Sequence, residues 1–164
     1  MVGVDILRDR TTTLLKLIVY LIGFIVLMLC VFWLPNMAQK AALIDPSYAY
    51  LKYPVLIGIY LTVLPFFFAL FHSLKLLSYI NHKNAFSELA VTSLKGVKYC
   101  AVLICILYLI GMVFLVTQDA LHPGIALIGF AILFASFSIS LFAAVLQELF
   151  TGALAIKSEL DLTV

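Results

Sequence analysis

Four long runs of apolar residues, separated by short polar segments, make up most of the chain. They cover residues 17–34, 54–74, 99–118 and 124–146, each is close to twenty residues long, and none contains a charged side chain. About twenty helical residues cross a bilayer core of about 30 Å. Backbone groups in hydrocarbon must be hydrogen-bonded internally, and four spans are too few to close a barrel, so each run is predicted to be a transmembrane helix.

The chain is predicted to be a single membrane domain with an all-α fold, an antiparallel four-helix bundle. The spans with their helical flanks are expected at about 14–34, 54–80, 97–118 and 124–150, with a cytoplasmic tail at 151–164. Short connections favour antiparallel neighbours. Small residues allow close helix contacts in membranes. Residues expected at these contacts are Gly23, Cys30, Gly58, Thr62, Ala69, Ser73, Cys100, Gly111, Gly129, Ser136, Ser140, Ala143 and Gln147.

The two sides of the bundle are predicted to differ. On one side the second and third helices project past the membrane as a hairpin with a polar turn, and Ser87 caps the third helix ahead of Glu88. On the other side residues 36–43 form a short surface helix that is capped by Asn36 and ends before Pro46. Aromatic residues of that outer segment are expected in an interfacial belt, namely Trp33, Tyr48, Tyr50 and Tyr53.

Composition and charge agree with a membrane protein and orient it. Hydrophobic residues make up 65% of the chain and charged residues 11%, against about a quarter charged in soluble domains. If the N-terminus is inside, Lys40 and Lys52 are the only basic residues that lie outside. The positive-inside rule therefore predicts that both termini are cytoplasmic. The basic residues on the inner side are Arg8, Arg10, Lys16, Lys75, Lys83, Lys95, Lys98 and Lys157. The formal net charge of only +2 argues against direct nucleic-acid binding.

The spans offer little chemistry, since ionisable residues near the middle of a span are usually functional and none lies there. A candidate polar cluster lies at the inner ends, made of His72, Lys75, Gln147 and Glu148. A structural role, with Lys75 reaching toward the headgroups, is favoured over a functional one. No metal-binding, phosphate-binding or nucleophile motif is present, so we expect no catalytic residues, no cofactor and no metal, and we expect that the protein is not an enzyme.

The inner surface carries the candidate contacts for a cytoplasmic protein. These residues are Lys83, Phe86, Leu89, Lys95, Glu159 and Asp161. For Phe86, partner contact is the less favoured interpretation. We favour packing against Leu89 and Ala90, or a turn of the side chain back toward the membrane. The tail could also dock on the lysine-rich hairpin, although exposed ion pairs contribute only about 0–1 kcal/mol each.

Three short segments resemble landmarks of a known family. They are Tyr50 to Pro54, Ala85 to Glu88, and Asp161 to Val164. Over nearly its full length the chain resembles the bacterial domain of unknown function 2975 family, the YoaS-like proteins. The resemblance implies a small four-span protein of the bacterial cytoplasmic (inner) membrane, often encoded beside a small helix-turn-helix regulator. It implies no catalytic residues, and Leu160 departs from the family's usual tail.

Two functional classes follow. The first is a non-enzymatic signalling or regulatory protein that binds a cytoplasmic partner, with the helix-turn-helix regulator as the partner that the resemblance implies. The second is a small transporter or an immunity protein against a membrane-active peptide, which the kink expected at Pro65 and the small-residue contacts favour. The lipid bilayer is a partner in either case. The sequence does not decide whether the protein forms a homo-oligomer.

Overall fold

The computed structural model describes residues 2–44, 46–81 and 87–162, and all regular structure in these ranges is helical. The elements are α1 (Val2–Met28), the π-helix η1 (Leu29–Trp33), α2 (Leu34–Ile44), the 3₁₀ helix η2 (Pro46–Leu51), α3 (Lys52–Asn81), α4 (Glu88–Thr117) and α5 (Pro123–Leu162). Four stretches are long and apolar enough to cross a membrane, namely Arg10–Lys40, Pro46–Ile80, Glu88–Thr117 and Pro123–Glu159. The predicted all-α fold with four spans is confirmed.

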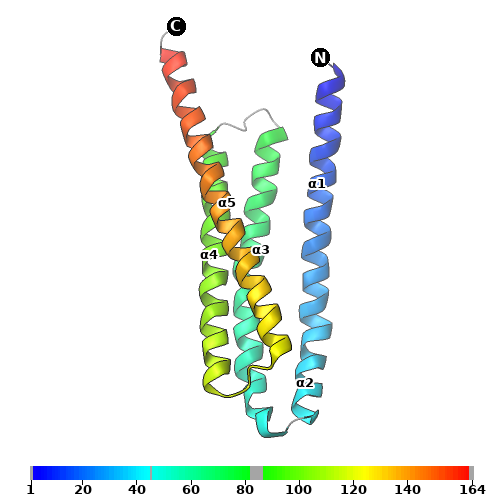
Figure 1. The fold of residues 1–164 in the computed structure, drawn as a ribbon. Helices are drawn as coiled ribbons and strands as arrows, with labels where there is room; N and C mark the ends of the chain where they lie inside the picture. Colours follow the sequence, from blue (N-terminus) through cyan, green and yellow to red (C-terminus); the bar gives the residue numbers. More distant parts are fainter. Residues whose placement is uncertain (1, 45, 82–86, 163–164) are drawn as a thin grey trace.

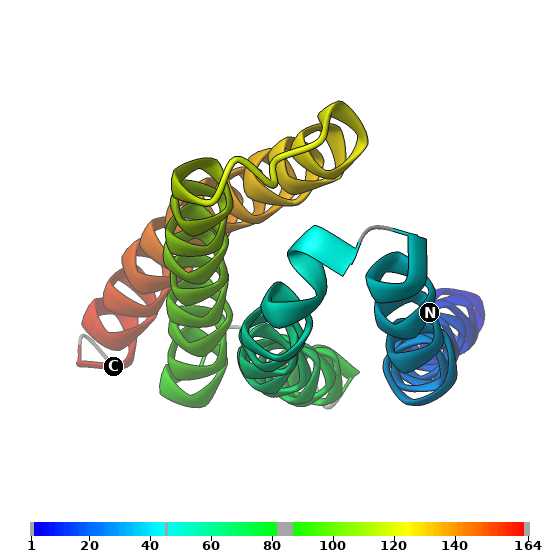
Figure 2. The same ribbon diagram turned by 90° about the horizontal axis from the view of Figure 1, so that it is seen from below.

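Consecutive long helices run in opposite directions and pack in chain order (Figure 1). Helix α4 packs along both α3 and α5, and α1 lies against α3. The view along the helices shows α1, α3 and α4 side by side, with α5 crossing α4 obliquely (Figure 2). The ends of α1 and α5 that hold the chain termini therefore lie on the same side of the molecule, the side that we predict to be cytoplasmic.

Small and short side chains form most of the interior. The buried residues of the described chain include Thr62, Ala90, Ser93, Ala101, Ser136, Ser140 and Ala143. Large apolar side chains lie outside, where lipid solvates them as well as protein would. Gly23 and Gly129 are buried as predicted, but the prediction for Gly58 and Gly111 is wrong, because both are exposed and a Cβ there would meet nothing within 4 Å.

The surface helix predicted at residues 36–43 is not separate from the first span but continues it. Helix α1 runs through η1 directly into α2, and the Leu34 N–H donates to the Leu29 carbonyl five residues back. The cause is Pro35, whose ring cannot fit beneath the carbonyl of an ordinary helical turn. Asn36 is therefore inside a helix and does not cap one; its side-chain amide donates to the Phe32 carbonyl at 2.7 Å. The predicted end of this helix before Pro46 is confirmed.

On the side that we predict to be outer, hydrogen bonds connect η2 to the turn between α4 and α5. The Tyr48 hydroxyl donates to the Asp119 carbonyl at 3.1 Å, and the Tyr50 hydroxyl donates to Oε1 of Gln118 at 2.9 Å. The Tyr48 ring also meets the His122 ring edge-on, with centroids 6.1 Å apart. These two tyrosines, predicted as belt residues, thus join the two outer connections to each other.

On the side that we predict to be inner, α3 and α4 extend past their apolar runs. Ser87 caps α4 as predicted, because its side chain accepts a hydrogen bond from the Ala90 N–H at 3.3 Å and Glu88 occupies the first turn. The tip of the hairpin at 82–86 lies outside the described residues. Helix α5 is continuous through 40 residues to Leu162, so the tail is helical at least to that point.

Candidate functional site

His72 lies in the interface between α3 and α4. A Cβ atom built on Gly96 would come within 2.7 Å of three atoms of the imidazole ring, so the ring rests directly on the glycine backbone. The ring also meets Phe71 edge-on, with centroids 6.1 Å apart. Its Nδ1 atom is buried and has no hydrogen-bond partner among the residues that the structure describes. His72 therefore fills the space that the missing side chain of residue 96 leaves.

Lys75 takes a different direction from His72. Its side chain is exposed, and its Nζ atom lies 4.6 Å from the centroid of the Phe71 ring, close enough for a cation–π interaction. A long basic side chain at the end of a span commonly extends this way toward the headgroups. The direction of the Lys75 side chain agrees with the interfacial role that we predict for it.

Gln147 and Glu148 lie in a groove between α4 and α5, which we call the inner groove. Its lining residues are Lys98, Ala144, Gln147, Glu148, Thr151 and Gly152, and its volume is about 570 Å³. Neither His72 nor Lys75 lines it. The structure thus divides the predicted inner cluster, with His72 and Lys75 on α3 and the other two residues facing α4. The sequence prediction of the cluster missed Lys98. Its position just before the third apolar run is the signal that could have found it, because it predicts the same depth as Glu148.

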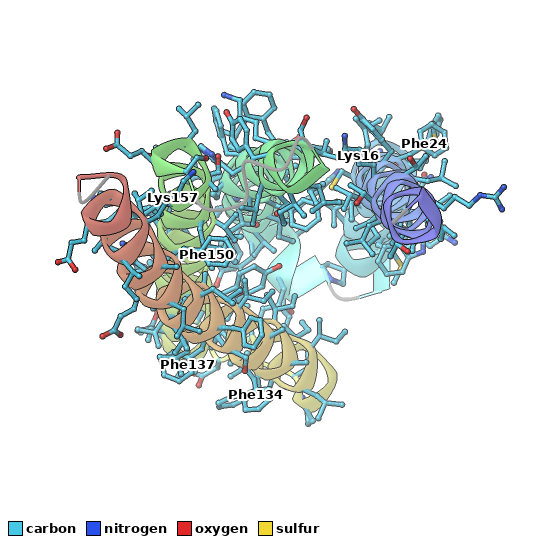
Figure 3. All side chains as sticks on the ribbon, turned by 90° about the horizontal axis from the view of Figure 1, so that it is seen from above. Lys16, Phe24, Phe134, Phe137, Phe150 and Lys157 are labelled. Atoms are coloured by element: carbon cyan, nitrogen blue, oxygen red, sulfur yellow. The ribbon has the colours of Figure 1, made fainter. Side chains whose placement is uncertain are left out.

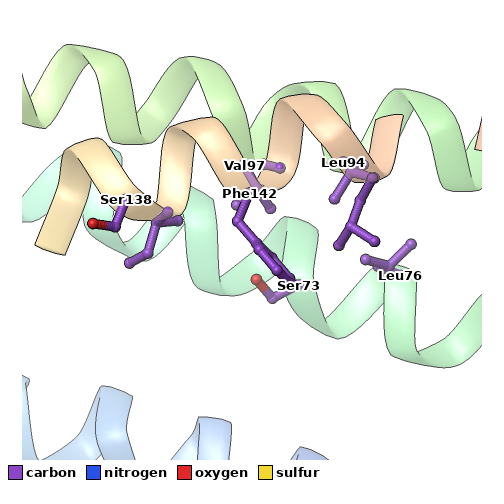
Figure 4. Close-up of a pocket in the computed structure, with 9 residues that line it drawn as sticks. Ser73, Leu76, Leu94, Val97, Ser138 and Phe142 are labelled. Atoms are coloured by element: carbon purple, nitrogen blue, oxygen red, sulfur yellow. The ribbon is translucent and has the colours of Figure 1, made fainter. Parts of the chain in front are cut away.

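A second hollow, between α3, α4 and α5, is almost wholly apolar (Figure 4). It has a volume of about 430 Å³, and Leu76, Leu94, Val97 and Phe142 are among its lining residues. Ser73 and Ser138 also line it, but each hydroxyl donates to a carbonyl of its own helix at 2.9 and 2.8 Å. The hollow offers no reactive group.

The candidate partner-binding residues are distributed over three segments. Leu89, with 59% of its surface exposed, and Lys95 lie on the first turns of α4, and Glu159 is exposed on α5. Lys83 and Phe86 lie outside the described residues, and of Asp161 only the backbone, at the end of α5, is described.

Polar contacts between the spans were not predicted. The Tyr60 hydroxyl on α3 donates to the carbonyl of Cys30 at 2.9 Å and so joins α3 to the first span. The thiol of Cys105 lies 3.7 Å from the Leu133 carbonyl of α5. Tyrosine in the middle of an apolar run is a signal for such contacts, because a buried phenol needs a partner.

No group of three or more His, Cys, Asp or Glu that could hold a metal ion occurs among the described residues. The three cysteines, Cys30, Cys100 and Cys105, are free thiols.

Comparison with known proteins places the chain among membrane proteins. The family model described as "Protein of unknown function (DUF2975)" matches residues 36–164. The uncharacterized membrane protein YoaS of Bacillus subtilis (strain 168) is 49% identical over 160 residues, which are 96% of this chain and 100% of that protein. No solved structure matches. The family model covers most of the chain, and YoaS aligns with the chain over the whole length of YoaS. This chain therefore belongs to the DUF2975 family.

Proposed function

We propose that this membrane protein is a non-enzymatic regulatory protein of the bacterial cytoplasmic membrane that binds a cytoplasmic protein at its inner face. The observation that carries the proposal is the length of α5. Its 40 residues correspond to about 60 Å of helix, whereas the bilayer core is about 30 Å thick. Part of α5 therefore extends into water beyond the end of α4 (Figure 1).

The chemistry of this extension supports a protein partner. Ile156 has 63% of its surface exposed and stands beside the exposed charges of Lys157 and Glu159. Leu89 is a second exposed apolar side chain at the inner end of the bundle. Apolar anchors surrounded by polar groups are typical of protein interfaces. The partner that the family resemblance implies is a small helix-turn-helix transcription regulator.

The proposal requires the termini to be cytoplasmic, which is a prediction in itself. In a variant whose three native cysteines are replaced by serine, we expect a cysteine at Leu89 to be protected in intact cells from a maleimide that cannot cross membranes, and one at Ser47 to be labelled. Both native side chains are exposed, so accessibility reports the side of the membrane. Labelling of Leu89→Cys from outside would reverse the topology and remove the proposal.

Partner binding is tested by co-purification with the helix-turn-helix protein in mild detergent. Truncation after Ala155, and separately replacement of residues 84–88, are expected to lower recovery of the regulator by about tenfold or more, since interface anchors contribute about 2 kcal/mol or more each. Leu89→Ser and Ile156→Ser should act in the same direction. Met37→Ser is the matched control, because it changes an exposed apolar residue on the opposite side.

All variants should unfold in detergent like the parent protein, so that lost binding is not lost folding. Equal recovery of the regulator with the truncated and parent chains would contradict the proposal. If no cytoplasmic protein binds and the purified protein moves or binds a small solute or peptide from the outer side, the transporter or immunity function replaces it.

A further inference from the structure

The inner groove lies at the depth where hydrocarbon gives way to lipid headgroups. Lys98 directly precedes the third apolar run, and Gln147 directly follows the fourth. Ala144 and Gly152 leave the space between the helices open because their side chains are minimal. A lipid headgroup in the inner leaflet would reach this position without leaving the membrane.

The groove carries one charge of each sign. Lys98 and Glu148 both line it, yet they form no ion pair with each other in the described structure. The Nζ atom of Lys98 instead lies 5.5 Å from the centroid of its neighbour Tyr99. Two separated opposite charges with no net charge suit a zwitterion better than an anion, because an anion would be repelled by Glu148.

Gln147 adds a requirement for a hydrogen-bond donor. Its Oε1 atom is buried and accepts no hydrogen bond from the described chain. The Thr151 hydroxyl, one turn away, donates to the Gln147 main-chain carbonyl at 2.8 Å and so leaves the amide unsatisfied. A buried acceptor without a donor is unfavourable. A primary ammonium in the groove can donate N–H groups to the exposed carboxylate of Glu148, and to the Gln147 amide once that side chain turns toward the groove, whereas a trimethylammonium has no N–H to donate.

Exposed apolar side chains continue from the groove toward the membrane centre. Val102 lies one turn along α4 from Lys98, and Leu141 and Val145 share the face of α5 that carries Glu148. Farther along α5, Phe134 and Phe137 are exposed on the side turned away from α3 (Figure 3). Acyl chains of a lipid held in the groove would lie on this surface.

We propose that the inner groove binds phosphatidylethanolamine, with the phosphate at Lys98 and the ammonium at Glu148 and Gln147. The site lies on the α4–α5 face and shares no residue with the proposed partner surface. Its test is therefore independent of the proposed function.

The test uses the full-length protein and counts retained lipid by native mass spectrometry. The protein is equilibrated with phosphatidylethanolamine, phosphatidylcholine and phosphatidylglycerol of the same acyl composition at equal concentrations. We expect phosphatidylethanolamine to be retained about tenfold over the other two, as one charge-assisted hydrogen bond would give. Glu148→Gln should remove the preference over phosphatidylcholine. Lys98→Gln should weaken retention of all three, and Lys16→Gln, an inner-side lysine outside the groove, should not.

Several results would overturn the proposal. Equal retention of phosphatidylcholine would show that the ammonium N–H groups are not recognised, and stronger retention of phosphatidylglycerol would show an anion site. Glycerophosphoethanolamine that binds as well as the intact lipid would assign the groove to a soluble ligand. The comparison of headgroups on the unmodified protein decides the proposal even where a variant fails to fold.

Discussion

Replacing Gly96 by leucine is expected to lower the free energy of unfolding by about 3 kcal/mol, because it overfills a close contact between α3 and α4. Even a single Cβ atom at this position would lie 2.7 Å from Cγ, Cδ2 and Cε1 of His72. Real Cβ atoms do not approach other atoms so closely. Either the imidazole leaves the interface or the two helices separate.

Unfolding in mixed micelles with increasing dodecyl sulfate measures this loss. Gly111→Leu is the matched control on the same helix, since a Cβ there meets nothing within 4 Å. It should be neutral or stabilising by up to about 1 kcal/mol, the difference in helix propensity. Gly96→Ala should be destabilising alone and much less so together with His72→Ala. Equal stability of Gly96→Leu and Gly111→Leu would show that the contact does not hold the helices together.

The outcome also bears on what His72 is for. Histidine at the inner end of a span invites a catalytic or proton-handling interpretation. Its ring is packed on Gly96 of the neighbouring helix, and this contact depends on the shape of the side chain. Lys75 over Phe71 and Glu148 in the inner groove are likewise at positions that suit interfacial roles. We therefore expect single alanine variants of His72, Lys75 and Glu148 to insert and fold.

The four spans were predictable because burying a charge in hydrocarbon is costly, so charged residues are excluded from about twenty consecutive positions. The Ser87 cap was predictable because capping depends on residues only three positions apart. The faces of the helices were harder. Nearly every side chain in a span is apolar, so hydropathy does not mark which side meets protein. Gly58 and Gly111 have the composition of contact residues, yet they face outward.

The candidate site shows the same limit. Position in the apolar run predicts depth along the membrane, and it placed Gln147 and Glu148 together, as the groove that both residues line shows. Which lysine shares their groove depends on helix rotation, and Lys98 on α4 holds that place rather than Lys75 on α3. Rotation is set by packing among all the helices. A sequence pattern that treats each helix separately does not contain it.

Replacing Tyr60 by phenylalanine is expected to lower the free energy of unfolding by about 1–3 kcal/mol, because it leaves a main-chain carbonyl in the membrane without a donor. In η1 the Leu34 N–H bonds to Leu29. The next donor in that pattern would belong to residue 35, which is proline and has no N–H. The carbonyl of Cys30 is therefore left to the Tyr60 hydroxyl, 2.9 Å away on α3.

The same geometry predicts a specific rescue. In a Pro35→Ala background, a main-chain N–H becomes available to the Cys30 carbonyl, and the cost of Tyr60→Phe should fall below about 0.5 kcal/mol. The four chains form a double-mutant cycle, read by dodecyl sulfate unfolding and by the distance between spin labels on α1 and α3. A cost of Tyr60→Phe that is the same with and without Pro35 would show that the hydroxyl does not compensate for the proline. Because α1 is attached to the other spans mainly along α3, loss of this bond should release α1 first.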